Sequence, residues 1–401
     1  MNFEQKVIQS GTVTTPKGFL AGATCAGINR QGKLDLGLLY SEVPCVAVGL
    51  FTTNKIKSAP VILSQKHLQN NKAQAIVVNS GCANACTGRQ GVKDAKETAS
   101  LTARKLNVLS EDVLIASTGV TGVPLPMEKV REGIMKTTLS KKGGHELAKA
   151  MMTTDTFPKE IAISVRAGSE QFIIGGVAKG SGMIHPDLAT LLCFLTTDAD
   201  VEADFLRSAL QEAVDMSFNM VTVDGDTSPS DSVFFLANGL AGNRRIDFKN
   251  GEPFQAALNR VCLYLAKAVA RDGEGATKLI EVVVEGAVDE AEARKAARNI
   301  ASSFLVKAAI HGSDPNWGRV VAVVGRSGIE VKESKIDLYL NQVCVMKSGN
   351  PAPFDKGALR KSLDKEEVYI RVCLNIGKSK ATAWGCDLSE EYVTINSAYT
   401  T

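Results

Sequence analysis

The sequence has little net charge and few histidines, and it lacks the segments that direct a chain to a membrane or out of the cell. Its 46 Lys and Arg residues against 43 Asp and Glu residues leave a formal net charge of +3, too weak a field to suggest a nucleic-acid partner. Residues 1–6 form neither an apolar segment nor an Arg-rich amphipathic one. We therefore expect a cytoplasmic protein with no nucleic acid and no membrane as partner.

The cysteines exclude two further classes. Nine cysteines lie between Cys25 and Cys386 without a repeated short spacing, and a chain of 401 residues does not need disulfides to fold. Cys82 and Cys86 are the closest pair, but neither a second pair nor clustered histidines complete a zinc site. The prediction is a protein with reduced thiols and no metal.

The apolar patterns predict a layered α/β architecture. Expected strands and helices alternate over the first 280 residues, with strands at 75–78, 113–116, 160–166 and 171–178 and helices at 92–106, 127–139, 201–218 and 253–271. After residue 280 the pattern changes to a charged helix at 287–301 and strands near 320–324, 335–340 and 367–374. The patterns thus indicate a core at 1–280 and a smaller β-rich domain at 281–401.

The segment from Lys179 to Phe194 is the most informative stretch. It is glycine-rich up to Pro186 and then becomes apolar, with Ala189 and Thr190 at the junction. A threonine at such a junction commonly caps a turn. It can also be an N-terminal nucleophile: its hydroxyl attacks the preceding carbonyl, and hydrolysis frees an α-amine with a pKa of about 7.7–8.0, which can act as general base. No histidine is required, and the chain has only four.

This segment, with the Leu191-Leu192-Cys193 and Thr197-Asp198-Ala199 that follow, resembles the self-cleavage site of the ornithine acetyltransferase family of arginine biosynthesis, also called the bifunctional glutamate N-acetyltransferase family. The resemblance implies that Thr190 is the nucleophile. Cleavage between Ala189 and Thr190 would give an α chain, 1–189, and a β chain, 190–401. The implied fold is a self-cleaving N-terminal-nucleophile-like acyltransferase, with mixed β-sheets sandwiched between helices and a smaller C-terminal domain.

Four more regions resemble parts of the family's active site. The turn after the strand at 113–116 is either a tight turn or an oxyanion hole, and the resemblance implies the second role for Thr118 and Gly119. The resemblance also makes substrate contacts of a set of residues that the local pattern alone assigns to turns, a solvated charge or a frayed tail. These are Thr153, Lys179, Thr190, Glu274, Asn396 and Thr401.

The implied reaction is acetyl transfer from N2-acetyl-L-ornithine to L-glutamate through an acetyl ester on Thr190, by an α2β2 heterotetramer of cleaved chains. No cofactor is expected; acetyl-CoA is a co-substrate only in bifunctional members, and the sequence does not decide between the two kinds. Two alternatives stay open. One is an aminopeptidase or amidase of the related self-cleaving fold, which would pass the acyl group to water. The other is a non-catalytic protein that retains the fold.

Overall fold

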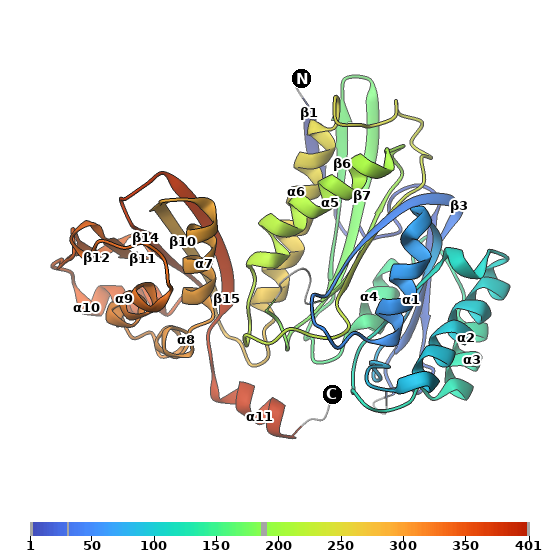
Figure 1. Ribbon diagram of the computed structural model, residues 1–401, viewed down its shortest axis with the longest axis horizontal. Coiled ribbons are helices and arrows are strands. Elements are labelled where there is room, and N and C mark those ends of the chain that lie inside the picture. The colour runs from blue at the N-terminus through green and yellow to red at the C-terminus, as the bar shows by residue number, and fades with distance from the viewer. Residues whose placement is uncertain (1–2, 30–31, 186–190, 399–401) are drawn as a thin grey trace.

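The computed structural model describes residues 3–29, 32–185 and 191–398. Within them the chain forms two mixed β-sheets with helices packed against both (Figure 1). This confirms the predicted α/β class with mixed sheets between helices. Every helix in these ranges is too short or too polar to cross a lipid bilayer.

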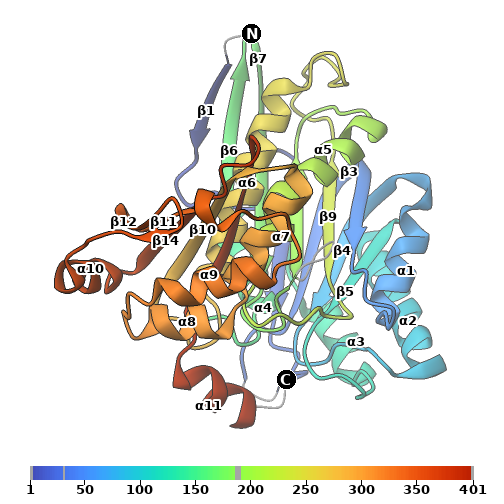
Figure 2. The same cartoon turned by 60° about the vertical axis from the view of Figure 1, so that its left-hand side comes forward.

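The first sheet has nine strands in the order β1-β6-β7-β8-β9-β3-β4-β5, with β2 paired to β3. Its strands are β1 Phe3–Val7, β2 Phe19–Thr24, β3 Leu36–Phe51, β4 Lys72–Asn79, β5 Val113–Ser117, β6 Lys159–Ala167, β7 Glu170–Lys179, β8 Leu192–Thr197 and β9 Ser232–Ala237. Its helices are α1 Ala59–His67, α2 Gly88–Leu106, α3 Met127–Lys136, α4 Gly144–Met151, α5 Ala203–Met216 and α6 Glu252–Arg271. Helices α1 and α2 pack against strands β4 and β5 (Figure 2).

Alternation along the central strands divides the core between the two faces of this sheet. Val233 and Phe235 of β9 belong to the apolar cluster that contains the buried residues of α5 and α6. Phe234 and Leu236, which point the other way, pack with Leu147 of α4. Since both faces are covered, these strands are continuous apolar runs.

Strand pairing at the centre of the sheet fixes the two ends of the segment from Lys179 to Phe194. β7 and β8 are antiparallel, with Lys179 opposite Leu192. β8 and β9 are parallel, with Leu192 beside Ser232. The end of β7, the start of β8 and the start of β9 therefore lie next to one another at one edge.

The second sheet has the order β13-β12-β11-β14-β10-β15. Its strands are β10 Leu279–Ala287, β11 Asp337–Leu340, β12 Val343–Lys347, β13 Asn350–Pro351, β14 Glu367–Cys373 and β15 Ser379–Cys386. The helices of this half are α7 Glu290–Ala301, α8 Phe304–His311, α9 Trp317–Arg326, α10 Lys356–Leu363 and α11 Glu390–Ala398. The domain boundary expected after residue 280 falls two residues into β10. After β15 the chain turns back toward the first sheet as α11 (Figure 1).

The strand expected at 320–324 is wrong, because these residues lie in α9. Val320, Val323 and Val324 are buried on one side of this helix, which packs on α7 and α8. The run of valines favours a strand by local propensity. Burial at helical spacing overrides that preference here.

Candidate active site

Two parallel strands deliver the expected oxyanion-hole residues to one edge of the first sheet. β4 and β5 run in parallel and end together at Asn79 and Ser117. The Thr118 amide donates to the Asn79 carbonyl at 3.0 Å, and the Ser117 hydroxyl donates to Asn79 Oδ1 at 2.6 Å. These bonds fix the start of the turn in which Gly119 follows.

Gly119 occupies a position that admits no side chain. Its φ is +122°, and an added Cβ would come within 2.4 Å of the backbone carbon of Gly81. Such a position requires glycine. Because residue 119 has no side chain, its backbone borders a cavity without being covered, as an oxyanion hole requires.

Lys179, the last residue of β7, joins two of the other expected residues. Its Nζ donates to Thr153 Oγ1 at 2.8 Å and to Thr118 Oγ1 at 3.5 Å. It also lies 3.8 Å from Asp155 Oδ2. Lys179 is buried. A lysine held in this way is a fixed positive charge at the edge of the sheet.

Glu274 and Asn396, two more of the expected residues, contact each other. The Glu274 amide donates to the Ser181 carbonyl at 2.9 Å, and Asn396 Nδ2 donates to Glu274 Oε2 at 2.7 Å. A Cβ on Gly182 would lie 2.5 Å from the Glu274 carboxylate carbon, so a larger residue there would displace the Glu274 side chain. The C-terminal helix α11 thus returns to the core and contacts Glu274.

A cavity of about 130 Å³ lies among these groups. It gathers the expected residues that the structure describes, which are Thr118, Gly119, Thr153, Lys179, Glu274 and Asn396. Leu191 and Leu192, the start of β8, also line it. Ala189, Thr190 and Thr401 lie outside the described residues.

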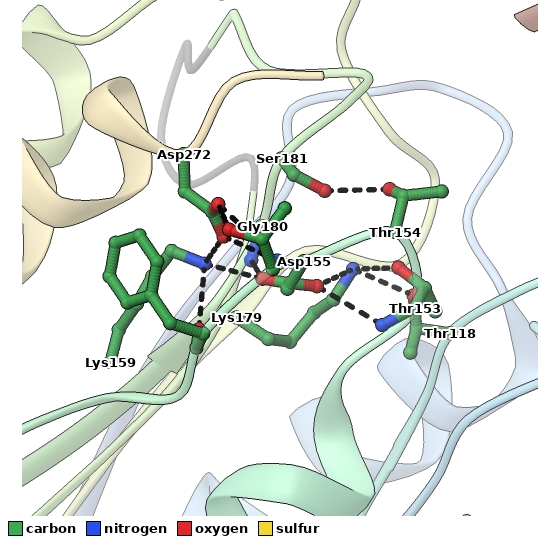
Figure 3. Close-up of polar contacts among 11 residues, drawn as sticks. Thr118, Thr153, Thr154, Asp155, Lys159, Lys179, Gly180, Ser181 and Asp272 are labelled. Carbon is green, nitrogen blue, oxygen red and sulfur yellow. Dashed lines mark hydrogen bonds and ion pairs between the residues drawn. The ribbon is translucent and has the colours of Figure 1, made fainter. Parts of the chain in front are cut away.

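A buried ionic network adjoins the cavity through Lys179 (Figure 3). Asp155 stands between two lysines, with Lys159 Nζ donating to its Oδ1 at 2.7 Å and Lys179 on its other side. It also accepts from the amides of Gly180, at 2.7 Å, and Thr153, at 3.1 Å. Burial alone would raise the pKa of Asp155, but the two lysines and these hydrogen bonds outweigh it and hold the pKa below its usual range.

The network extends to the loop that carries Glu274. Lys159 Nζ also donates to Asp272 Oδ2 at 2.5 Å, and Asp272 accepts from the amide and the hydroxyl of Thr156. Lys159 and Asp155 are fully buried, with 0% side-chain exposure. The 153–159 loop, the end of β7 and the end of α6 are therefore held by one set of charges.

The acidic loop at 223–232, which follows α5, holds the backbone of residues 183–185. Asp224 accepts from the amides of Met183 and Ile184 at 2.5 and 2.9 Å. Thr227 Oγ1 donates to the His185 carbonyl at 2.9 Å. The loop thus positions the chain leading toward the expected cleavage point.

Sequence reasoning missed the network and one wall of the cavity. Lys159 precedes an apolar run and looked like an ordinary strand start, and nothing local to Asp155 or Asp272 reveals their shared cation. Ser230 and Asp231 also line the cavity. The only feature of the sequence that points to these two residues is their position directly before a buried strand.

The chain is similar in sequence and in fold to known proteins. Residues 20–401 match the model of the ArgJ family. The arginine biosynthesis bifunctional protein ArgJ of Dehalococcoides mccartyi is 53% identical over 399 residues, covering 98% of each chain. That of Symbiobacterium thermophilum is 52% identical over 398 residues, covering 98% of this chain and 99% of the other. A crystal structure of the arginine biosynthesis bifunctional protein argJ from Bacillus halodurans is 43% identical, with a TM-score of 0.50, and covers 51% of this chain and 97% of that one. The chain therefore belongs to the ArgJ family.

Proposed function

We propose that this chain is a glutamate N-acetyltransferase of arginine biosynthesis. In this proposal it moves the acetyl group of N2-acetyl-L-ornithine to L-glutamate through an acetyl ester on Thr190. One observation carries the proposal. The cavity beside the start of β8 combines a turn suited to an oxyanion hole, a buried lysine and a glutamate. Family membership supports the same assignment.

The proposed reaction begins with cleavage between Ala189 and Thr190, which frees the Thr190 α-amine. This amine takes the proton of the Thr190 hydroxyl while the oxygen attacks the acetyl carbonyl of the donor. Thr118 and Gly119 stabilise the negative charge on the carbonyl oxygen. The carbon–nitrogen bond then breaks, the proton passes to the leaving ornithine amine, and Thr190 carries the acetyl ester.

The second half of the reaction reverses these steps with another amine. The α-amine of L-glutamate attacks the ester and leaves as N-acetylglutamate, which restores the Thr190 hydroxyl. Lys179 is suited to bind the α-carboxylate of either amino acid, because its Nζ is a fixed cation on the cavity wall. Glu274 is suited to bind the amine that leaves or attacks.

Several further points belong to the proposal. The 51% of this chain that matches 97% of the Bacillus halodurans chain is about the size of residues 190–401, which favours cleavage in the family. The relatives are named bifunctional, which favours acetyl-CoA as a second acetyl donor. We also propose an α2β2 assembly in the cytoplasm, with no cofactor or metal. Sedimentation of the purified protein tests the assembly.

Intact-protein mass spectrometry, before and after brief incubation with N2-acetyl-L-ornithine, tests the proposal directly. We expect two fragments split between residues 189 and 190, with one acetyl group added to the fragment that begins at Thr190. Adding L-glutamate should remove this group as N-acetylglutamate. Release as acetate whether or not L-glutamate is present would indicate the amidase alternative. One uncleaved chain without an adduct would indicate the non-catalytic alternative.

A Glu274→Ala variant should impair transfer more than cleavage. Glu274 lines the cavity where the amines would bind, but its role in the proposed cleavage is only indirect. We expect kcat/KM for transfer to fall by about ten- to a hundredfold, the range for a lost hydrogen bond to a charged group. The rate of cleavage after synthesis, followed by mass spectrometry, should stay close to that of the wild type. The exposed Glu42→Ala is the control, and equal losses in both rates would contradict this role.

A further inference from the structure

Asp231 is a buried residue of the cavity lining, and one of its carboxylate oxygens is unsatisfied. It directly precedes β9, is 3% exposed and lines the cavity. Among the residues that the structure describes, none forms a hydrogen bond with its Oδ2 or with the neighbouring Ser230 Oγ. Buried polar groups are nearly always paired, because an unpaired one has lost its water without replacement. These two atoms therefore indicate that something is bound here when the enzyme is at work.

The charges around the cavity indicate what is missing. Among the described residues that line it, Lys179 is positive, and Glu274 and Asp231 are negative. Lys179 already lies against Thr153 and Asp155, and Glu274 already accepts from Asn396. None of these neighbouring residues forms an ion pair with Asp231. A positively charged group would balance the Asp231 carboxylate.

The strand register brings Asp231 close to the proposed chemistry. The Ser232 amide donates to the Leu191 carbonyl at 2.9 Å, and Leu192 lies beside Ser232. Asp231 is therefore adjacent to Leu191, the first residue after the proposed nucleophile. A carboxylate at this point borders both the cavity and the start of β8.

From these observations we propose that Asp231 binds a primary ammonium group in the cavity. The inference rests on the proposed function, whose first half-reaction supplies two such groups. One is the α-amine that cleavage frees at residue 190, and the other is the side-chain ammonium of N2-acetyl-L-ornithine. Both offer the same chemistry to Asp231: a positive charge with N–H donors for the unpaired oxygen.

The electrostatics of the site support this role. Burial raises the pKa of Asp231 well above its usual range, and Ser228 and the charge of Lys179 only partly offset it. The carboxylate form is thus disfavoured until an opposite charge arrives. An ammonium group would supply that charge and favour the ionised carboxylate.

The test compares Asp231→Asn with the matched control Asp226→Asn in the cleaved, full-length enzyme. Asn keeps the shape of the side chain and removes its charge, and Asp226 is an exposed aspartate of the same loop. Steady-state kinetics are measured with N2-acetyl-L-ornithine and with N2-acetyl-L-norvaline, which has the same carbon chain without the ammonium. Each variant is also checked by mass spectrometry for cleavage and by its unfolding temperature.

Two results would support the proposal and identify the amine. A KM raised at least about tenfold for the ornithine donor, with little change for the norvaline donor, assigns the group to the substrate. A kcat lowered at least about tenfold for both donors assigns it to the new N-terminus. Asp226→Asn should match the wild type throughout. Unchanged kcat and KM with both donors would overturn the proposal, since water alone would then satisfy Asp231.

Failure of the proposed function can be told apart from failure of this inference. If the wild type accepts no acetyl group, the acetyltransferase proposal fails whatever Asp231 does. Asp231 is then judged by calorimetric titration of both proteins with L-ornithine and L-norvaline, and by their unfolding temperatures. Weaker binding of L-ornithine alone by Asp231→Asn, or a lower unfolding temperature of the cleaved protein, would support an ammonium partner. Equal binding and equal unfolding temperatures would overturn it.

Discussion

A Thr190→Ala variant is expected to remain a single chain and to transfer no acetyl group. In the proposed mechanism one hydroxyl attacks first the Ala189 carbonyl and then the donor, so its removal stops both reactions. Loss of a nucleophile that works with its own base lowers kcat by several orders of magnitude, on the order of 10⁴-fold or more. Mass spectrometry of the purified variant measures the cleavage, and formation of N-acetylglutamate measures the transfer.

Thr190→Ser provides the matched control, because it keeps the hydroxyl and removes only a methyl group. It should cleave and transfer acetyl, although at reduced rates. A Thr190→Ala enzyme with transfer at the wild-type rate would remove Thr190 from the mechanism. A variant that fails to cleave but still transfers acetyl would separate the two reactions and assign the second to another group.

Local sequence could predict the layers of the fold, because strand and helix periods differ clearly in most segments. The run at 113–116 became β5, and the amphipathic patterns at 201–218 and 253–271 became α5 and α6. The valine run at 320–324 is the exception. Five small apolar residues suit a strand or a buried helix equally, and only the packing of α9 on its neighbours decides between them.

The site could be predicted only through its resemblance to a family. Local pattern assigns Thr153 to a turn and Asn396 to a frayed tail, yet both line one cavity. These residues are 243 positions apart. No periodicity in the sequence encodes a shared site over that separation. The two residues line the same cavity because α11 returns to the first sheet, near the ends of α4 and β7. A glycine with positive φ, such as Gly119, also needs the backbone before its role is visible.

The buried network was invisible for a different reason. The Lys159–Asp272 pair spans 113 residues, and a lysine at a strand start is normally a solvated charge. Only the structure reveals that this side chain is fully buried between two aspartates. The burial of these paired charges depends on three segments that are far apart in sequence and meet only in the folded protein. No local sequence rule therefore detects it.

Lys159→Met is expected to destabilise the protein more than any surface charge substitution. Removing one partner of a buried ion pair leaves the other charged and unpaired, which costs about 3–5 kcal/mol. Here Asp272 would lose the lysine at 2.5 Å, and Asp155 would lose the one at 2.7 Å and keep only Lys179 at 3.8 Å. The measurement is the shift of the urea unfolding midpoint, made on the uncleaved Thr190→Ala chain so that one polypeptide is compared throughout.

Lys136→Met is the matched control. Lys136 pairs with Glu132 at 2.9 Å, but both side chains are more than 60% exposed, so its loss should hardly move the midpoint. Asp272→Asn should fall between the two, because Lys159 keeps Asp155. If Lys159→Met unfolds at the same urea concentration as Lys136→Met, the buried network does not stabilise the fold.

The pH dependence of stability separates the charge of Lys159 from its packing. The pKa of Asp155 is lowered in the folded protein, so the stability that its ionised form contributes is complete above its unfolded pKa, about 3.9, and is lost as the pH falls below that value. Without Lys159 that pKa should rise toward its usual value or above, because burial then outweighs the remaining charge of Lys179. The acid-induced loss of stability should therefore be smaller in Lys159→Met than in its parent. Parallel stability curves between pH 3 and pH 7 would mean that the lysine acts through its volume, whereas converging curves at low pH would show that its charge holds Asp155 ionised beneath the cavity.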